Sequence, residues 1–525
     1  MRDLPRQFNL TDYYLLDRLT DGMGSRTALR FGERSWTYDL VADQTLRMVS
    51  VLQELGLEQE DRVYLVLPDI PPFAWSFFGA LKAGGVVVMG NPLSKAEDLA
   101  YVVEYVRPRV IITTESVAAR LESHWGEATG KPTLLIVPDA STHDDPEARI
   151  SDHRCLATAL AGASGQPSCP ETNRDDPAIW LFTSGSTGRP KAAMHCHRDF
   201  AFNTEVYAKE PIGYQSDDVC VSVPRLFFGY ATGTNLMFPF SVGACAALFS
   251  EKPTAERIAW AIKYYRATAL TNVPTLMSRL LEADAAGSDI DLSSLRFSLS
   301  AGEALPPALL ERWMGRFDVP VYDGIGSAEM FHIYLTNRPD DVKPGSLGRP
   351  VHGYELKILP ADAPGPGAEE VPIGETGLLW IKGDSVATGY WQDREKSWAT
   401  FHGHWCRSSD LFRRDEDGYY WFGGRADNLL KVSGQWVSTL EIEHCLATHP
   451  AVIEAAVIGV KADGLVSTRA FVEAREPGSD ALATALQDHA RTHLAKYKYP
   501  REVVFVDALP RNDRGKVDKK ALPND

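Results

Sequence analysis

The sequence predicts an α/β fold, with a large N-terminal lobe of mixed and parallel β-sheets flanked by helices and a small α+β domain after it. Apolar runs typical of buried strands alternate with helical segments from residue 35 to residue 182. This order favours a parallel sheet that is covered on both faces. With 525 residues the chain is too long for one hydrophobic core, so at least two lobes are expected.

The N-terminal half supplies the alternation of strands and helices. Apolar residues recur at helical spacing over 35–57, where Gly56 marks the end of a helix. The polar segment 139–176 predicts a loop with one short helix over 153–161. Further helices are expected at 72–83 and 95–106, and strands at 62–67, 86–89, 110–113, 133–137 and 178–182.

The C-terminal half changes its pattern near its end. Strands are expected at 219–224, 295–299 and 377–381, and residues 361–368 are expected to form a hairpin loop. The last ~100 residues have the size of a small domain of their own. They combine expected helices and strands without regular alternation, at 440–448, 452–460, 469–473 and 481–494.

Composition and charge exclude several classes of partner. Hydrophobic residues make up 44% of the chain and charged residues 24%, as in ordinary globular proteins. The formal net charge of −16 disfavours nonspecific binding to nucleic acid or to an acidic membrane. The N-terminus lacks the apolar core of a signal peptide, and no apolar run reaches the ~18 residues of a membrane span. A cytoplasmic location is therefore expected.

The seven cysteines are scattered, and no two of them have C-x-x-C spacing. Reduced thiols are therefore expected. His195, Cys196 and His197 invite a zinc hypothesis. Because neighbouring residues in a strand point to opposite faces, the three side chains cannot easily ligate one ion, and no zinc site is expected there.

A stretch that reads T-S-G-S-T-G-R-P-K spans Thr183 to Lys191 and follows the expected strand at 178–182. Its four hydroxyls can donate to phosphate oxygens, its two glycines let the backbone approach an anion, and Lys191 adds a cation. It is not the usual P-loop, because Pro190 separates Gly188 from Lys191. A solvated Gly/Ser turn is the alternative, but so many hydroxyls directly after a strand favour a polyphosphate site.

Three further segments combine glycines with groups that can bind ligands. Arg225 to Gly233 reads R-L-F-F-G-Y-A-T-G, and composition alone favours core packing for its aromatic residues. Leu295 to Pro306 holds S-L-S-A-G-E-A-L-P, where exposed backbone groups after a strand are well placed to bind an adenine edge. Tyr322 to Glu329 reads Y-D-G-I-G-S-A-E, a Gly-rich turn closed by Glu329. A lone carboxylate there is a solvated surface group unless it binds a ligand.

These motifs, in this order, resemble the adenylate-forming superfamily of acyl- and aryl-CoA ligases, carrier-protein-loading adenylation domains and luciferases. The resemblance covers nearly the whole chain. Arg225–Gly233, together with F-P-F-S-V-G-A at Phe238–Ala244, is most similar to benzoate-CoA and 2-aminobenzoate-CoA ligases. The resemblance implies a large domain over 1–425 with a small β-barrel-like subdomain, a hinge over 426–430, and a mobile C-terminal domain over 431–525.

The resemblance also implies a nucleotide site. Lys516 corresponds to the family's adenylation lysine, Lys431 is a further catalytic candidate, and Mg²⁺ is expected on Glu329 with Thr187. Asp410 corresponds to the aspartate that accepts hydrogen bonds from both ribose hydroxyls. The implied ATP- and AMP-binding positions are Thr183, Ser184, Gly185, Ser186, Thr187, Gly188, Lys191, Gly302, Glu303, Ala304, Asp323, Gly324, Ile325, Ser327, Asp410 and Arg425.

Two residues depart from the common pattern of the superfamily. Ile325 stands where an aromatic residue commonly stacks on adenine, and benzoate ligases share this difference. Ala328 stands where a threonine contacts the α-phosphate, so that hydroxyl is missing. Ser327 is the candidate to replace it.

The resemblance places the aryl-acid pocket at a small set of residues, although a satisfied core histidine is the alternative for His332. Benzoate ligases carry alanine at the position of Gly229, and the missing methyl group favours a substrate with an ortho substituent, such as 2-aminobenzoate. A methyl group is worth only ~1–3 kcal/mol of selectivity. The implied pocket residues are Phe228, Gly229, Tyr230, Gly326, His332 and Ile333, the implied hinge is Asp427, and the implied thiol face is Ser433, Gly434 and Trp436.

The expected function is that of an ATP- and Mg²⁺-dependent ligase that converts a benzoate-type acid, through an aryl-adenylate, to its coenzyme A thioester. One alternative is a stand-alone adenylation enzyme that loads an aryl or acyl group onto the phosphopantetheine of an acyl carrier protein. Another is a nucleotide-binding regulatory protein without catalysis, which Lys516, Glu329 and Lys191 argue against. Monomer and homodimer both remain open.

Overall fold

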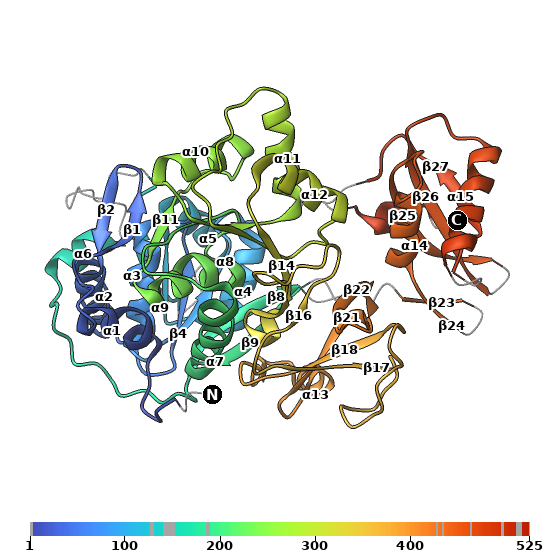
Figure 1. Cartoon of the computed structure of the whole chain (residues 1–525). Coiled ribbons are helices and arrows are strands. Elements are labelled where there is room, and N and C mark those ends of the chain that lie inside the picture. The colour runs from blue at the N-terminus through green and yellow to red at the C-terminus, as the bar shows by residue number, and fades with distance from the viewer. Residues whose placement is uncertain are drawn as a thin grey trace. The chain divides into compact units, whose positions relative to one another are not determined.

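The chain divides into two units, one formed by Met1–Leu356 and Ile381–Cys406 and the other by Lys357–Trp380 and Arg407–Asp525. They are seen in a computed structural model, drawn in Figure 1, that describes residues 4–125, 131–139, 153–184, 189–426, 429–432, 435–462, 465–494, 498–510 and 517–523. The expected hinge over 426–430 and the domain limits beside it stay a prediction.

The first sheet of unit 1 has the strand order β19-β9-β8-β4-β3-β5-β6-β7. Its strands from β8 to β7 are parallel, whereas β9 runs antiparallel to β8 and to β19. The strands are β3 (Arg62–Val66), β4 (Val86–Met89), β5 (Val110–Thr114), β6 (Thr133–Val137), β7 (Arg154–Cys155), β8 (Pro177–Ser184), β9 (Pro190–Cys196) and β19 (Gly389–Tyr390). The expected parallel sheet is thus confirmed.

Helices cover this sheet on both faces. Leu99 and Val103 of α4 and Leu121 of α5 join one apolar cluster with the strand residues Val88 and Ile111. On the other side α3 is buried nearly all round, as its uniformly apolar sequence predicts. The N-cap hydroxyl of Thr37 accepts a hydrogen bond from Leu40 and starts α2. The helices are α2 (Tyr38–Glu54), α3 (Pro71–Lys82), α4 (Ala96–Val106), α5 (Glu115–Trp125) and α6 (Leu156–Gly162).

The second sheet of unit 1 has the order β16-β15-β14-β13-β12-β10-β11-β1-β2. Its central strands are parallel, and β2, β15 and β16 are antiparallel to their neighbours at the edges. The strands are β1 (Thr27–Phe31), β2 (Arg34–Thr37), β10 (Val219–Ser222), β11 (Cys245–Leu248), β12 (Ala269–Asn272), β13 (Phe297–Ser300), β14 (Val321–Gly326), β15 (Ile333–Thr336) and β16 (Arg349–Pro350).

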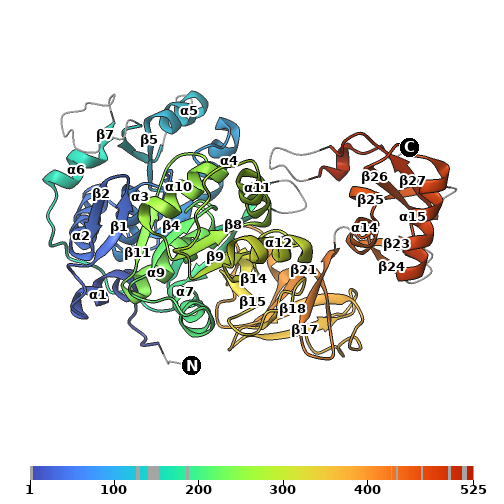
Figure 2. The ribbon, with the colours of Figure 1, turned by 45° about the horizontal axis from the view of Figure 1, so that its top comes forward.

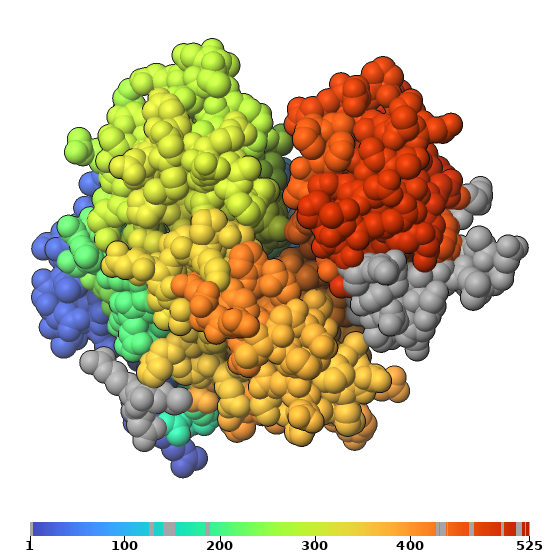
Figure 3. Space-filling model, turned by 45° about the vertical axis from the view of Figure 1, so that its right-hand side comes forward, coloured from blue at the N-terminus to red at the C-terminus, as the bar shows by residue number. Residues whose placement is uncertain are grey.

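Three amphipathic helices pack on this second sheet, α10 (Ala255–Tyr265), α11 (Pro274–Ala285) and α12 (Pro307–Phe317). They lie together in Figure 2, and the yellow-green surface in Figure 3 belongs to this region of unit 1. Short helical turns connect the strands elsewhere in the unit. They are η1 (Asp12–Leu16), α1 (Asp17–Thr20), α7 (His197–Asn203), η2 (Thr204–Ile212), α8 (Gly229–Thr232), η3 (Gly233–Met237), α9 (Phe238–Val242) and α13 (Arg394–Thr400).

The segment 322–329 corrects one expectation, because most of it is strand and not a Gly-rich turn. Residues 321–326 form β14, which pairs with β13 on one side and β15 on the other. The glycines serve close packing of the backbone: a Cβ on Gly326 would lie 2.4 Å from the carbonyl oxygen of His332. The turn begins later, at the 3-10 helix η4 (Ala328–Met330).

Unit 2 contains a sheet in which β17 (Glu355–Leu359), β18 (Gly377–Lys382) and β21 (Trp405–Arg414) are neighbours and β22 (Tyr420–Arg425) pairs with β21. Its C-terminal part has a hairpin of β23 (Leu429–Val432) and β24 (Gln435–Ser438). There α14 (Thr439–Ala447) and α15 (Asp480–His493) pack on a sheet of β25 (Val452–Ala462), β26 (Leu465–Ala474) and β27 (Glu502–Phe505). The expected α+β arrangement is confirmed. Among the described residues, no helix is both long and apolar enough to cross a membrane.

Candidate active site

The expected phosphate loop is the tip of the antiparallel hairpin formed by β8 and β9. Thr183 pairs with Lys191, and Ser184 pairs with Pro190. The paired strands therefore hold the two ends of the loop close together. The loop residues Gly185, Ser186, Thr187 and Gly188 lie outside the described residues, as do Asp427, Ser433, Gly434 and Lys516.

Tyr390 connects the base of this hairpin to Glu329. Its hydroxyl oxygen Oη donates a hydrogen bond to Glu329 Oε1 across 2.7 Å, and Lys191 Nζ lies 4.9 Å from the centre of its ring. Burial, followed by the charge of Glu329, raises the pKa of Tyr390 far above its usual value, so the phenol stays a donor. The backbone N–H of Ala387 donates to the carbonyl oxygen of Glu329 at 2.8 Å. Sequence reasoning missed Tyr390, whose only signal is a G-Y pair 61 residues after Glu329.

His195 on β9 fixes the residue just before Glu329. Its Nε2 donates to the carbonyl oxygen of Ala328 at 2.7 Å, and its Nδ1 lies 2.9 Å from Asp199 Oδ2. The ring is fully buried, and burial raises the pKa of Asp199. His197 belongs to a different network, because its Nδ1 accepts a hydrogen bond from the backbone N–H of Leu10 at 3.2 Å. The two histidines thus have separate structural partners.

A tight turn centred on Phe331 separates Glu329 from His332. Phe331 has φ of +67° and ψ of −59°, and the N–H of His332 donates to the carbonyl oxygen of Met330 at 2.9 Å. This is the rare γ-turn with positive φ, which is strained for a bulky residue. The Phe331 ring is held 4.3 Å from the ring of Phe200, centre to centre. Packing of the Phe331 ring thus stabilises the turn between the carboxylate of Glu329 and the imidazole of His332.

His332 is a buried, neutral histidine with one unused acceptor. Its Nε2–H donates to the carbonyl oxygen of Tyr230 at 3.0 Å, and burial lowers its pKa to about 3. Its Nδ1 has no hydrogen-bond partner among the described residues, and neither has the buried hydroxyl of Tyr230. Rings of Tyr207, Tyr230 and Phe238 lie 5.5, 5.4 and 4.7 Å from the imidazole centre. The arrangement is an aromatic cluster with an unfilled acceptor and an unpaired hydroxyl.

Of the other expected pocket residues, Gly326, Ile333 and Gly229 lie near this aromatic cluster, whereas Phe228 is exposed. Gly326 pairs with Ile333 across β14 and β15. Gly229 begins α8, and a Cβ built on it would lie 3.3 Å from Leu181 Cδ1 and 3.6 Å from the carbonyl oxygen of Phe331. Phe228 is the N-cap residue of α8 and is 52% exposed, so about half of it lies in solvent.

Asp69 anchors the segment that leads into Gly229, and sequence reasoning did not identify it. Its Oδ1 accepts a hydrogen bond from the N–H of Leu226 at 3.0 Å, and its Oδ2 lies 3.6 Å from Arg225 Nη1. Asp69 is only 2% exposed, and burial raises its pKa to about 6 despite the opposing charge of Arg225. The turn over 225–229 is thus held on the loop between β3 and α3.

The expected adenine segment follows β13 at its carboxyl end. Gly302, with φ of +82°, and Ala304 are exposed, whereas the carboxylate of Glu303 is engaged. Glu303 Oε2 accepts from the N–H and the hydroxyl of Thr275 at 3.0 and 2.7 Å. The segment therefore offers backbone groups to a ligand, while the Glu303 side chain holds the start of α11. Asp323 on the neighbouring strand is buried, and burial raises its pKa to about 7.

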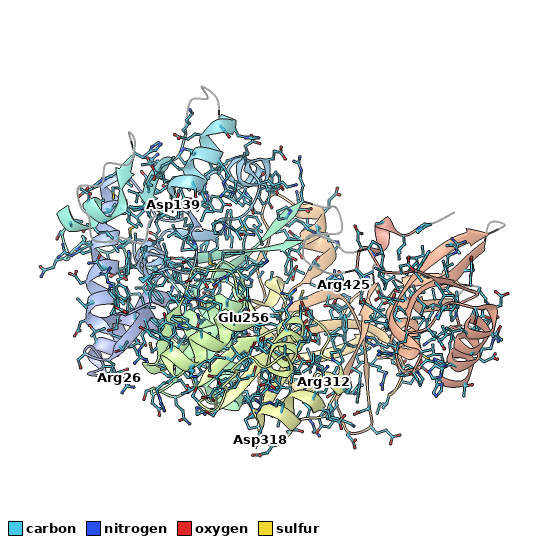
Figure 4. All side chains as sticks on the ribbon, turned by 90° about the horizontal axis from the view of Figure 1, so that it is seen from above. Arg26, Asp139, Glu256, Arg312, Asp318 and Arg425 are labelled. Carbon is cyan, nitrogen blue, oxygen red and sulfur yellow. The ribbon has the colours of Figure 1, made fainter. Side chains whose placement is uncertain are left out.

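Asp410 and Arg425 meet across β21 and β22 in unit 2. The two residues are paired in register, and Arg425 Nη1 lies 3.2 Å from Asp410 Oδ1. Asp410 is 8% exposed, whereas Arg425, labelled in Figure 4, is exposed. A carboxylate supported by a guanidinium suits recognition of a ribose diol. The backbones of Lys431 and Trp436 are paired in register across the β23–β24 hairpin.

The chain is similar to known proteins over nearly its whole length. The model of the AMP-binding enzyme family matches residues 16–391, and that of the AMP-binding enzyme C-terminal domain matches 441–516. A benzoate–CoA ligase of Thauera aromatica is 38% identical, covering 99% of this chain and 96% of its own. An anthranilate–CoA ligase of Pseudomonas aeruginosa is 33% identical, covering 89% and 87%. The crystal structure of the anthranilate CoA ligase AuaEII in complex with anthranoyl-AMP superposes with a TM-score of 0.85 at 34% identity, covering 98% and 96%.

Proposed function

The chain belongs to the AMP-binding enzyme family, and from this premise we propose that it activates 2-aminobenzoate in preference to benzoate. The chain is an acid–thiol ligase of the AMP-forming, aryl-CoA type, and its substrates are a benzoate-type acid, ATP and coenzyme A. We propose the preference for the 2-amino acid together with the roles of individual residues and of a magnesium ion.

The chemistry has two steps. In the first, a carboxylate oxygen of the aryl acid attacks the α-phosphorus of ATP, the bond to the bridging oxygen breaks, and pyrophosphate leaves. In the second, the sulfur of coenzyme A, having lost its proton, attacks the carbonyl carbon and displaces AMP. Both steps bring negative charges together, so positive charge and preorganised donors are the main contribution that the protein makes.

We assign the first step to residues from both parts of the chain. The hairpin residues Thr183 and Lys191 hold the ends of a phosphate-binding loop, and Lys516 neutralises the carboxylate and the α-phosphate. The backbone of 302–304 meets adenine, and Asp410 with Arg425 receives the ribose. Arg425 and Asp410 already form an ion pair at 3.2 Å, which orients the carboxylate. Ser327 takes the place of the threonine hydroxyl that Ala328 lacks.

The donor set fits a magnesium ion, because Glu329 is a partly exposed carboxylate that keeps one oxygen beyond the Tyr390 hydrogen bond. Magnesium held by Glu329 and Thr187 would spread the charge of the ATP phosphates. Tyr390 orients the carboxylate, and His195 fixes the backbone on its N-terminal side. Two side chains therefore fix the position of Glu329, Tyr390 through its carboxylate and His195 through the carbonyl oxygen of the preceding residue.

The unpartnered Nδ1 of His332 is the observation that carries the substrate preference. Because Nε2–H donates to Tyr230, Nδ1 of the neutral ring is an acceptor, and it has no partner among the described residues. An unsatisfied buried acceptor costs about 1–3 kcal/mol. The amino group of 2-aminobenzoate supplies an N–H donor, whereas benzoate supplies none. Relatives named for benzoate and for anthranilate support the same substrate class.

The variant His332→Phe tests this assignment, since it keeps a flat ring and removes the acceptor. The ratio of kcat/KM for 2-aminobenzoate to that for benzoate should fall about tenfold, which corresponds to ~1.4 kcal/mol. AMP release with a panel of benzoates, ATP and coenzyme A gives both values. An unchanged ratio would remove His332 from the substrate site. Thioester formation with free coenzyme A separates this function from the loading of a carrier protein.

We propose further that thioester formation follows a rotation of the C-terminal domain over 431–525 about Asp427. Lys516 then withdraws, and the hairpin with Lys431, Ser433, Gly434 and Trp436 replaces it beside the adenylate. A change of this kind lets one cleft serve two reactions in sequence. The assignment rests on the family and on the position of these residues in the chain.

A further inference from the structure

Three side chains that can bind a metal ion meet between α14 and α15 in the C-terminal part of unit 2. Cys445 lies on α14, and His489 and His493 lie one turn apart on α15, so that both rings are on the same face of the helix. One ligand atom from each residue lies within 4.8 Å of the other two. Figures 1 and 2 show both helices in the C-terminal part of unit 2, together with β25 and β26.

The hydrogen bonds around His489 fix the position of its proton. The hydroxyl of Thr448 donates to the carbonyl oxygen of Cys445 at 2.7 Å, so its single proton is used. Toward His489 Nε2, 2.8 Å away, the same oxygen can only accept. His489 therefore carries its proton on Nε2, and the lone pair of Nδ1 remains for another partner.

His493 is fixed in the complementary way. Its Nδ1 lies 2.8 Å from the carbonyl oxygen of His489. Because a carbonyl oxygen only accepts, Nδ1 carries the proton and Nε2 keeps its lone pair. A hydrogen bond from the second ring nitrogen to a backbone oxygen is the arrangement that metal-binding histidines usually show.

We infer that Cys445, His489 and His493 form a binding site for a zinc(II) ion. One thiolate and two imidazoles are ligands that zinc prefers, and a water molecule can complete a tetrahedral site. Zinc–nitrogen bonds of about 2.0–2.1 Å and zinc–sulfur bonds of about 2.3 Å place ligand atoms ~3.3–3.7 Å apart. The ligand atoms of the three residues lie within 4.8 Å of one another, so a modest approach of the side chains would complete this geometry.

The neighbouring histidine and the nearby carboxylates that the structure describes have partners other than the three proposed ligands. His449 is itself engaged through Nδ1, which accepts from the N–H of Ala451 at 3.3 Å. The nearby carboxylates are paired, Glu441 with Lys498 and Asp488 with Arg491. Zinc binding must displace the proton of the Cys445 thiol, because the thiolate is the form that binds the metal.

The bound ion would join α14 to α15 and so stabilise the C-terminal part of the chain. An ion that binds only the folded form raises the melting temperature in a concentration-dependent way. None of the three ligands has a role in the activation chemistry proposed above. A chain that binds no zinc could therefore still form the aryl-CoA thioester.

Titration of the metal-free full-length protein with Co²⁺, followed by displacement with Zn²⁺, tests the site. The wild type should bind one equivalent of Co²⁺ with a thiolate-to-cobalt charge-transfer absorption band, and Zn²⁺ should raise its melting temperature. Cys445→Ser should abolish the band. His493→Gln changes an exposed side chain, so folding is preserved, and it should weaken Co²⁺ binding about tenfold or more.

His449→Gln is the matched control, because His449 lies beside His489 but has no assigned ligand role. It should bind Co²⁺ within about twofold of the wild type, a difference of ~0.4 kcal/mol. The absence of a saturable charge-transfer band in the wild type would overturn the inference. Wild-type affinity in His493→Gln would overturn it equally, even if Cys445→Ser failed to fold.

Discussion

Tyr390 Oη donates a hydrogen bond to Glu329 Oε1 across 2.7 Å, while Lys191 Nζ lies over the face of the same ring at 4.9 Å. One tyrosine thus connects the strand that follows the phosphate loop to the carboxylate proposed to hold magnesium. The pairing of β19 with β9, which sets Tyr390 opposite Ala193, brings it there.

Tyr390→Phe should weaken the dependence of the enzyme on magnesium without disturbing the hairpin. The variant removes the hydrogen bond but keeps a ring beneath Lys191. Loss of a partner that orients a metal ligand typically costs 10–100-fold, so the Mg²⁺ concentration for half-maximal adenylation should rise about tenfold. Tyr105→Phe is the control, because the Tyr105 hydroxyl donates to the carbonyl oxygen of Trp391 in the same unit. An identical magnesium requirement in wild type and Tyr390→Phe would contradict the role.

Asp69→Asn should change stability in a pH-dependent way. In the folded chain the pKa of Asp69 is about 6, above the ordinary 3.8, so the folded state keeps this proton longer. The stabilising contribution of the protonated carboxyl is complete below pH ~4 and is lost as the pH rises through about 6. A shift of this size corresponds to about 3 kcal/mol.

The melting temperature of Asp69→Asn, minus that of the wild type, should therefore increase from pH 4 to pH 7. Asparagine keeps an acceptor for the N–H of Leu226, so the turn over 225–229 is retained. Thermal unfolding at a series of pH values measures the difference. A difference that stays flat or falls over this range would show that Asp69 is not a buried carboxyl with a raised pKa.

Gly229→Ala tests the steric part of the substrate preference. The added methyl group would lie 3.3 Å from Leu181 Cδ1, which is a tight contact, and Leu181 must yield by a few tenths of an ångström. The ratio of kcat/KM for 2-aminobenzoate to benzoate should fall by about tenfold, the lower end of what one methyl group supplies. Gly162→Ala, whose methyl group meets nothing within 4 Å, is the control. If both variants keep the wild-type ratio, the space left by the missing methyl group at Gly229 does not set the substrate preference.

Asp427→Pro tests the proposed hinge. Proline fixes φ and removes a backbone donor, so a rotation centred there is restricted. Formation of the aryl-adenylate should be nearly unchanged, whereas its conversion to the thioester should slow by about tenfold or more. Single-turnover measurements of the two half-reactions separate them. Equal loss in both, or loss in neither, would place the hinge elsewhere.

The sequence was sufficient to predict the fold class, because the spacing of apolar residues and the length of apolar runs distinguish strands from helices before tertiary contacts are known. The strands over 86–89 and 133–137 are found where apolar runs predict them. The segment 321–326 was misjudged because its glycines are typical of turns. In the structure Gly326 allows the backbone of His332 to approach β14 closely, and this contact depends on the pairing of β14 with β15.

The site was predictable where its residues form one local motif and not where it depends on distant contacts. Thr183 to Lys191 could be recognised from its own composition. Tyr390 and Asp69 could not, because each acts on a residue far away in the chain, Glu329 and Leu226. Conversely, Glu303 is in the expected segment, but its carboxylate binds Thr275. Side-chain partners of this kind are set by the fold.

The central claim, that an aryl-adenylate forms with the help of a lysine from the C-terminal domain, is tested most directly by Lys516→Ala. Its two half-reactions should be measured separately, as ATP–pyrophosphate exchange driven by 2-aminobenzoate and as thioester formation from supplied aryl-adenylate and coenzyme A. Exchange should fall at least ~100-fold, as for loss of one main charge-stabilising group, while thioester formation is largely retained. Equal loss of both half-reactions, or exchange at the wild-type rate, would show that Lys516 does not assist formation of the adenylate.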